Sequence, residues 1–337
     1  MADFNYTPSE VTAYLGLVDT YIRWRAHRDR KERSYHSYHP SEFGHCLRQQ
    51  QYRHYVSKGY IEVENKNFDS RMLRLFDNGH FMHARWGGYF EEIGVLRGVW
   101  KCNNKLCYIF DDNGNPSNID KNNIEKILKD NKSRKYGEEH IHGVFKPEKC
   151  VCGCCDFSYI EAVVESKELN MYGHCDVILD LSNLKKDRFK EVKESFNRDF
   201  LSDGIVVGDM KSISSESCKN QLERKGPHKY YLIQLTCYSY ILGCEYGLLM
   251  YENKNNSELS FYKVENNDTW WEAIQYQARV MQDLASGEKK RLPPPRPDSK
   301  SAYECKNCEF RKICHKSPAW DNKNLDNQRK DFYKCLL

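Results

Sequence analysis

Two charged residues stand near the end of an apolar, strand-like segment, where charge is costly to bury. Residues 204–213 read GIVVGDMKSI, and Asp209 and Lys211 lie two apart, so both side chains project from one face of the expected strand. Both groups lose hydration at such a place. Asp176 occupies a similar place on the preceding expected strand. If the two strands pair, two carboxylates converge beside one lysine.

This trio suits the hydrolysis of a phosphodiester. Carboxylates hold Mg²⁺ or Mn²⁺, the metal polarises the phosphoryl oxygen and lowers the pKa of a bound water, and a lysine can position that water or offset developing charge. The alternative interpretation is a surface salt bridge at a strand end, because Asp-x-Lys is a short motif.

Three further features lie around the trio. His83 follows Gly79 by four residues on an expected helix, and a Gly-x-x-Asp pattern ends at Asp176. Gln234 and Tyr238 lie four residues apart on the helix after Asp-x-Lys, so they share a face. Each of these residues alone is more typical of a structural role. Their order and their expected secondary structures favour a single site.

The chain has 15 cysteines, an odd number that cannot be fully paired. In a reducing compartment, clustered cysteines are typical of metal or redox sites. Cys305, Cys308 and Cys314 supply three ligands, and Cys46 completes a set of four if the C-terminal segment folds back. Zn²⁺ and a [4Fe-4S] cluster both accept four thiolates, so spacing leaves both open. The adjacent His315 is a competing ligand.

A second group of cysteines lies in the polar segment 101–157, which we interpret as an insertion. Cys102-x4-Cys107 and Cys152-x-x-Cys155 indicate a zinc ribbon, because paired thiolates at short spacing chelate a tetrahedral ion and a segment without a core needs such a link. Free cysteines in a loop are the alternative. Other ligands available in the same stretch are Cys150, Cys154, His140 and His142.

Length and composition are those of a globular protein. The 337 residues correspond to about two domains, or to one domain with insertions. A chain that is 39% hydrophobic and 13% aromatic is too apolar for disorder. It has no apolar run of about 18 residues and no visible signal peptide, so we expect no membrane contact. We expect a cytoplasmic protein of a bacterial, archaeal or virus-infected cell. The net charge of +4 alone implies no partner.

Hydrophobic periodicity predicts a mixed α/β body. Helices are expected at 9–30, 69–93, 228–242 and 269–284, with another that begins after Ser41 as its N-cap. Strands are expected at 94–100, twice within 158–181, and at 204–213, 246–253 and near Phe261.

Two faces follow from these periods. On the helix 69–93, one stripe contains Met82, Trp86, Tyr89 and Ile93. On the second strand of 158–181, one face contains Tyr172, His174, Asp176 and Ile178, and the other contains Cys175, Val177 and Leu179.

In this order the motifs resemble those of PD-(D/E)XK nucleases of the RecB-like branch. The chain is most similar to CRISPR-associated iron–sulfur exonucleases and to the nuclease domains of AddB-type helicase–nucleases. That branch carries a G-x-x-x-H helix, a G-x-x-D strand, a (D/E)-x-K strand and a Q-x-x-x-Y helix, with one cysteine near the N-terminus and three near the C-terminus. The match covers 40–100 and 158–316 and departs at Asp209, where many relatives have Glu, and at Leu47, where proline is usual.

The resemblance implies a restriction-endonuclease-like core, in which helices flank a mixed central sheet. It divides the chain into an N-terminal helical part of the nuclease domain (1–100), a zinc-binding insertion (101–157), the nuclease core (158–290) and an iron–sulfur segment (291–337).

The resemblance also implies roles for individual residues. The metal ligands would be His83, Asp176, Asp209 and the main-chain carbonyl of Met210. Lys211 would act on the attacking water. Gln234 and Tyr238 would contact DNA or support Lys211. The [4Fe-4S] ligands would be Cys46, Cys305, Cys308 and Cys314.

The function expected from these features is a Mg²⁺- or Mn²⁺-dependent deoxyribonuclease. It would be an exonuclease of DNA ends or single strands, active in DNA processing, repair or recombination, with a helicase or a recombination or integration protein as a possible partner. Two alternatives stay open: a nucleic-acid-binding protein that no longer cuts, and a redox sensor built on the iron–sulfur cluster. The intact set of Asp176, Asp209 and Lys211 favours the nuclease.

Overall fold

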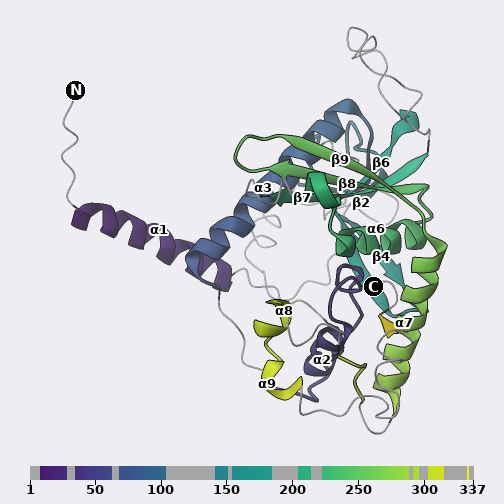
Figure 1. Cartoon of the computed structure of the whole chain (residues 1–337). Helices are drawn as coiled ribbons and strands as arrows, with labels where there is room; N and C mark the ends of the chain where they lie inside the picture. The colour runs from purple at the N-terminus through teal and green to yellow at the C-terminus, as the bar shows by residue number, and fades with distance from the viewer. Residues whose placement is uncertain are drawn as a thin grey trace, which may run out of the picture.

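A mixed sheet forms the centre of the protein, which is described here by a computed structural model (Figure 1). The structure describes residues 8–28, 35–62, 68–103, 141–150, 154–183, 204–213, 222–287, 291–295, 303–314 and 332–333. The strand order of the main sheet is β2-β1-β6-β7-β8-β9, with β3 also paired to β1, and β4 and β5 form a separate two-stranded ribbon.

The main sheet contains both strand orientations. β7 and β8 are parallel, and the other described pairings are antiparallel. A parallel pair needs a crossover, which α6 (Lys229–Leu242) provides. The strands are β1 (Leu96–Cys102), β2 (Ile141–Val144), β3 (Phe157–Ile160), β4 (Ala162–Ser166), β5 (Met171–Cys175), β6 (Val177–Asp180), β7 (Ile205–Ile213), β8 (Tyr246–Asn253) and β9 (Leu259–Glu265).

Helices cover both faces of the sheet. α3 (Ser70–Ile93) contributes Met82 to a core that also contains Met210, whereas α6 contributes Leu235 to a core that contains Val207. Successive residues of β7 therefore enter opposite cores, as a strand buried on both faces requires. The side chain of Asp209 consequently lies on the α6 side.

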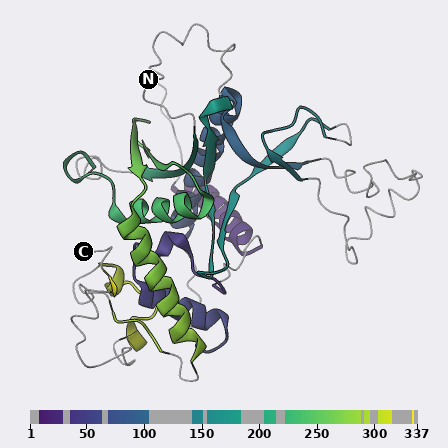
Figure 2. The same cartoon turned by 90° about the vertical axis from the view of Figure 1, so that its right-hand side faces the viewer.

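A smaller helical layer lies at the end of the molecule away from the sheet (Figure 2). It contains α2 (Leu47–Ser57), α8 (Tyr303–Lys306) and α9 (Arg311–Cys314), beside α7 (Asp268–Ser286). Tyr52 of α2 stacks on Phe310, with ring centroids 4.9 Å apart, so segments far apart in sequence share one core. The first helix, α1 (Pro8–Arg28), contacts α3 through the pairs Arg25–Asp77 and Arg74–Asp19.

The expected α/β class is confirmed, and most expected helices and strands occur within a few residues of their predicted bounds. The two strands expected within 158–181 are instead four short ones, β3 to β6. One helix start is wrong. Ser41 lies in the short 3-10 helix η1 (Pro40–Glu42), and α2 begins only after its N-cap residue Cys46. At Gly44 the backbone passes so close to α6 that a Cβ atom would lie 2.3 Å from the Cα of Tyr230.

The expected faces are also corrected. The chain bends at Asp176, where it leaves the β4–β5 ribbon and enters the main sheet as β6. Cys175 therefore joins the α6-side core, while Val177 joins the α3-side core. On α3, Tyr89 is 48% exposed, and Phe90 packs against the core instead.

Part of the expected insertion extends the main sheet, because β2 pairs with β1 from Gly98 to Lys101. Residues 104–140 lie outside the described part of the chain. Among the described residues, no helix is long and apolar enough to cross a membrane.

The close approach at Gly44 generates a stability prediction. Gly44→Ala should lower the free energy of unfolding by about 1–3 kcal/mol, because the added methyl group would clash with the backbone of Tyr230. Gly88→Ala is the matched control. Apart from the backbone of α3 itself, no atom of the described residues lies within 4 Å of its Cβ position, so this change should stabilise by up to about 1 kcal/mol. Urea unfolding measures both, and equal effects would contradict the assignment of the close contact.

Candidate functional site

A cleft of about 710 Å³ opens beside the point where β5, β7 and α6 meet. Asp176, Asp209 and Lys211 line its wall together with Gln234 and Tyr238 of α6. The remaining lining residues come from the η1–α2 segment and from β5 and α6: His39, Pro40, Ser41, Glu42, His45, Arg53, Tyr172, Gly173, His174 and Tyr231. The structure therefore brings five of the predicted site residues to one surface.

The main chain at Met210 contacts both His83 and Asp176. His83 Nε2 is 3.1 Å from the Met210 carbonyl oxygen, and the Met210 N–H donates to Asp176 Oδ2 at 2.7 Å. His83 Nδ1 and Asp176 Oδ1 are 3.6 Å apart. Helix α3, the bend after β5 and strand β7 thus meet at one point. The main-chain carbonyl named from the sequence faces the predicted histidine ligand.

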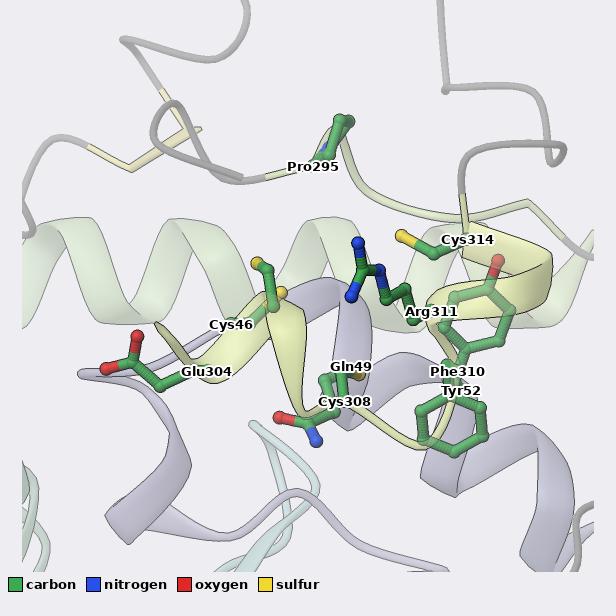
Figure 3. Close-up of a pocket in the computed structure, with 10 residues that line it drawn as sticks. Cys46, Gln49, Tyr52, Pro295, Glu304, Cys308, Phe310, Arg311 and Cys314 are labelled. Carbon is green, nitrogen blue, oxygen red and sulfur yellow. The ribbon is translucent and has the colours of Figure 1, made fainter. Parts of the chain in front are cut away.

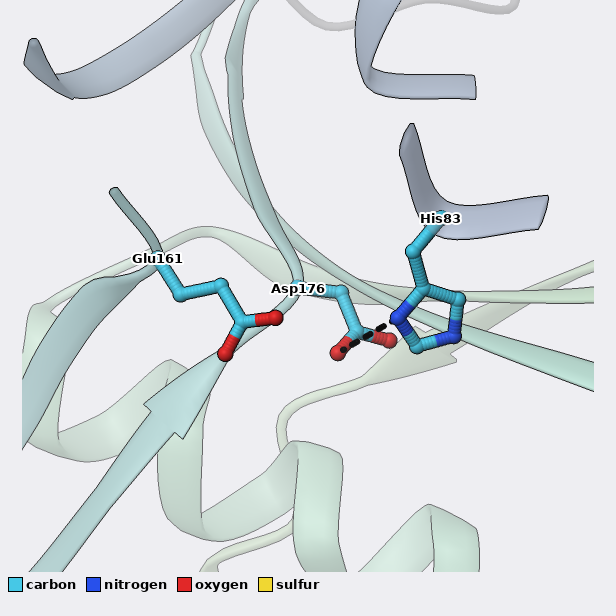
Figure 4. A group of neighbouring side chains, drawn as sticks. All are labelled: His83, Glu161 and Asp176. Carbon is cyan, nitrogen blue, oxygen red and sulfur yellow. Dashed lines mark ion pairs between the residues drawn. The ribbon is translucent and has the colours of Figure 1, made fainter. Parts of the chain in front are cut away.

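Glu161 is a candidate ligand that sequence reasoning missed. Its carboxylate, Asp176 and His83 offer ligand atoms that all lie within 4.8 Å of one another (Figure 4). Glu161 precedes β4 directly, and Ala162 pairs with Cys175, so the hairpin brings Glu161 beside Asp176. The sequence signal was the pair of strands in 158–181. Their antiparallel register, which aligns the two carboxylates, was not predicted.

The electrostatics of Glu161 fit a crowded acidic position. Loss of hydration and the negative charge of Asp176 raise the pKa of the Glu161 carboxyl, against a lowering by His83, His174 and His80. A cation bound between two neighbouring carboxylates offsets the repulsion between their negative charges. Among the described residues, His83, Glu161 and Asp176 are the one group of three His, Cys, Asp or Glu side chains whose ligand atoms lie this close together.

Asp209 is held differently from the other predicted ligands. Its side chain is 1% exposed, and Lys211 Nζ lies 2.9 Å from Oδ1 and 2.8 Å from Oδ2. Gln234 Nε2 also donates to Oδ1, at 3.0 Å. Burial and the charge of Asp176 raise the pKa of Asp209 to about 7, although Lys211 opposes this shift. The Asp209 carboxylate is thus turned toward Lys211 and Gln234, next to the group of three.

Lys211 keeps its charge because of the same neighbours. Burial lowers the pKa of its ammonium group, but the carboxylates of Asp209 and Asp176 outweigh that effect and raise the pKa. The side chain is 21% exposed and lines the cleft. A charged ammonium group therefore faces the cleft beside the carboxylates.

Gln234 and Tyr238 form a hydrogen-bonded chain. Gln234 Nε2 donates to the Tyr238 hydroxyl at 3.0 Å, and that hydroxyl donates to the His174 carbonyl oxygen at 2.8 Å. The i, i+4 spacing on α6 makes the first contact possible. Gln234 thus contacts Asp209, whereas the sequence interpretation had offered Lys211 or DNA as its partner. Tyr238 ties α6 to β5.

The four cysteines Cys46, Cys305, Cys308 and Cys314 line one pocket (Figure 3). Cys46 is the N-cap of α2, and the other three lie in the segment of α8 and α9. Burial raises the pKa of the Cys46 thiol to about 12, helped by the three neighbouring thiols. The structure therefore brings the N-terminal cysteine of the predicted ligand set together with the three C-terminal cysteines.

A buried arginine supports this pocket. Arg48 is 1% exposed, and it donates to the carbonyl oxygens of Cys314 at 3.0 Å and Pro293 at 2.7 Å. On the next turn of α2, Arg53 pairs with Glu309 at 2.9 Å and with Glu42 at 2.7 Å. These contacts connect the cysteine segment to the η1 wall of the cleft.

The second predicted cysteine set is described in part. Cys102 ends β1 and is buried, and Cys155 is exposed. Cys107 and Cys152 lie outside the described residues. Cys150 belongs to the same core cluster as Cys102, and its N–H donates to the Cys154 carbonyl at 2.8 Å. The alternative ligands Cys150 and Cys154 therefore lie near Cys102.

A carboxylate on β8 fixes the helix that carries His83. Glu252 is 8% exposed and accepts hydrogen bonds from Arg85 and from Trp86 Nε1, the latter at 2.7 Å. Because β8 is hydrogen-bonded to β7, these contacts set the position of α3 relative to the Asp209–Lys211 strand.

Comparisons with known proteins add little. No protein-family model and no curated protein matches the sequence. The chain is similar to a solved structure titled "Crystal structure of SSO0001", with 12% identity and a TM-score of 0.39 over 91% of this chain and 98% of that chain.

The position of Glu252 generates a prediction about metal affinity. Glu252→Gln should weaken Mn²⁺ binding about tenfold, because residues that orient metal ligands typically contribute at this scale. Glu91→Gln is the control. Glu91 also lies on α3, and the change removes its ion pair with Lys146, which should leave Mn²⁺ binding unchanged. Calorimetric titration measures affinity, and thermal unfolding separates it from stability. Unchanged Mn²⁺ affinity in folded Glu252→Gln would contradict the positioning role.

Proposed function

We propose that the chain is a divalent-metal-dependent nuclease that hydrolyses phosphodiester bonds in DNA. The observation that supports this most is the main chain at Met210, whose carbonyl oxygen contacts His83 and whose N–H donates to Asp176. The next residues on either side of Met210 are Asp209 and Lys211. A mixed sheet with a crossover helix that carries Gln234 and Tyr238 is compatible with a PD-(D/E)XK core.

The donor atoms at this point fit a Mg²⁺ or Mn²⁺ ion. His83, Asp176, Glu161 and the Met210 carbonyl combine oxygen atoms with one imidazole, a set that suits Mn²⁺ and accommodates Mg²⁺. When bound, the ion supplies Lewis acidity toward a phosphoryl oxygen and lowers the pKa of a water ligand. We assign Glu161 to the ligand set beside His83, Asp176 and the Met210 carbonyl, which the resemblance also implies. Asp209, the other ligand that the resemblance implies, bonds instead to Lys211 and Gln234.

The other residues of the site would bind the substrate and hold one another in position. Lys211 presents its ammonium group to the cleft, where it can hold a phosphate oxygen or the attacking water. Asp209 fixes the direction of that ammonium group, and Gln234 fixes Asp209. Tyr238 keeps β5, and with it Asp176, against α6. Each group is held before substrate arrives, which is what electrostatic catalysis requires.

We further propose that the four-cysteine pocket holds a [4Fe-4S] cluster. Zn²⁺ and a [4Fe-4S] cluster both accept four thiolates. The family resemblance favours the cluster, with Zn²⁺ as the alternative. Its role would be to hold α2 and the C-terminal segment together.

The other parts of the proposal come from the family resemblance. They are exonuclease action on ends or single strands, a role in DNA processing, repair or recombination, and a helicase or recombination partner. A Zn²⁺ ion in the segment 101–157 is proposed on Cys102, Cys107, Cys152 and Cys155.

Removal of single site residues tests the nuclease. Asp209→Asn should reduce cleavage of linear DNA with Mn²⁺ on the order of a thousandfold and keep DNA binding, because several kcal/mol of transition-state stabilisation depend on the metal and on Lys211. His83→Ala and Asp176→Asn should weaken Mn²⁺ binding in calorimetry, whereas Lys211→Ala should slow cleavage and leave metal affinity largely intact. Chelator-treated parent protein is the control. Equal cleavage by Asp209→Asn and parent would contradict the assignment.

Metal analysis tests the cysteine pocket. Anaerobically purified protein should be brown, with about four iron atoms per chain and a broad absorbance near 400 nm. Cys308→Ser should lose iron and thermal stability first and activity second. Cys155→Ser is the matched control and should keep its iron, because Cys155 does not line the four-cysteine pocket. Colourless protein with two zinc ions would mean that both sites hold zinc.

A further inference from the structure

Strand β5 presents two aromatic side chains to the cleft directly before Asp176. Met171, Gly173 and Cys175 are buried, and the alternate residues Tyr172 and His174 are exposed. Both of these side chains line the cleft that contains the catalytic residues. Their rings lie edge to face, with centroids 5.3 Å apart and an interplanar angle of 89°.

Neither ring packs in a core cluster. Tyr172 is 37% exposed, and neither it nor His174 belongs to a described apolar cluster. The strand beneath them is held on both sides, because β5 pairs with β4 and the Tyr172 N–H donates to the Tyr38 carbonyl oxygen at 2.9 Å. The two rings are therefore exposed on a rigid backbone, which is how a ligand platform differs from a mobile surface side chain.

The strand geometry places the rings in order from the proposed metal. Residues of a strand advance about 3.3 Å each, so His174 and Tyr172 stand about 7 and 13 Å along the chain from Asp176. A strand of nucleic acid whose phosphodiester lies at Asp176 would pass these rings in succession. Aromatic side chains also reach the cleft from α6, where the Tyr231 ring lies 4.9 Å from Lys211 Nζ.

We infer that Tyr172 and His174 form a stacking platform for unpaired nucleobases of the substrate strand. This inference rests on the proposed nuclease and adds a binding subsite to it. Bases stack on aromatic side chains irrespective of sequence, because each base has a π-face, and each stacked base contributes about 1–3 kcal/mol. Bases within a duplex stack on their neighbours and offer no free face. The platform therefore selects a single strand and is indifferent to its sequence.

Binding of single strands with and without bases tests this platform. Fluorescence anisotropy would measure affinity for an oligothymidylate and for an abasic strand of equal length, with EDTA present so that nothing is cut. Tyr172→Ala should weaken binding of the oligothymidylate about tenfold and leave binding of the abasic strand unchanged. Tyr172→Phe should retain the affinity of the parent, because the ring remains. Tyr276→Ala, which removes a 44% exposed ring on α7, is the matched control and should change nothing.

Two outcomes would overturn the inference. Equal losses on both strands would mean that Tyr172 contacts the backbone or supports the fold, and unchanged binding of both would mean that it contacts no substrate. Either result leaves the nuclease proposal intact if the parent protein cuts DNA with Mn²⁺. A parent that neither binds nor cuts any strand would contradict the nuclease proposal itself.

Discussion

A buried carboxylate in the middle of the sheet constrains the rest of this structure. Asp209 is 1% exposed, and its charge is tolerable only beside fixed partners that replace lost water. Lys211 supplies the opposite charge from the same strand, and Gln234 supplies a hydrogen bond from α6. Because these partners come from β7 and from α6, the environment of Asp209 in the cleft depends on how α6 packs against β7.

The same requirement extends outward along hydrogen bonds. Gln234 bonds to Tyr238, and Tyr238 bonds to the backbone at His174, so the position of β5 depends on α6. On the other face, Glu252 bonds to Arg85 and Trp86. Two independent sets of contacts therefore determine where Asp176 and His83 stand relative to β7.

The four-cysteine pocket adjoins the cleft, because His45 lines the cleft and the next residue, Cys46, lines the pocket. Arg53 bonds both to Glu309, which follows Cys308, and to Glu42 of the cleft wall. The η1–α2 segment thus contributes to both places. Stabilising the pocket would stabilise one wall of the cleft, which gives the proposed cluster a structural connection to binding without a direct role in chemistry.

The sequence by itself predicted the local structure and much of the site. Alternation along 204–213 was enough to predict that Asp209 and Lys211 share a face. The i, i+4 spacing of Gln234 and Tyr238 predicted that they share a helix face, and in the structure they are hydrogen-bonded. These predictions succeed because side-chain direction in a strand or helix depends on neighbours two to four residues away. The family resemblance implied that Cys46 joins the C-terminal cysteines, and the structure brings all four to one pocket.

Only the tertiary structure decided which distant groups meet and how. The bend at Asp176 moves the chain from one sheet into another, and the hairpin register brings Glu161 beside that residue. The partner of Gln234 is Asp209 because α6 packs against β7, a contact that no local pattern encodes. Periodicity identifies the face that a side chain occupies, whereas the opposing side chain is chosen by the packing of segments far apart in sequence.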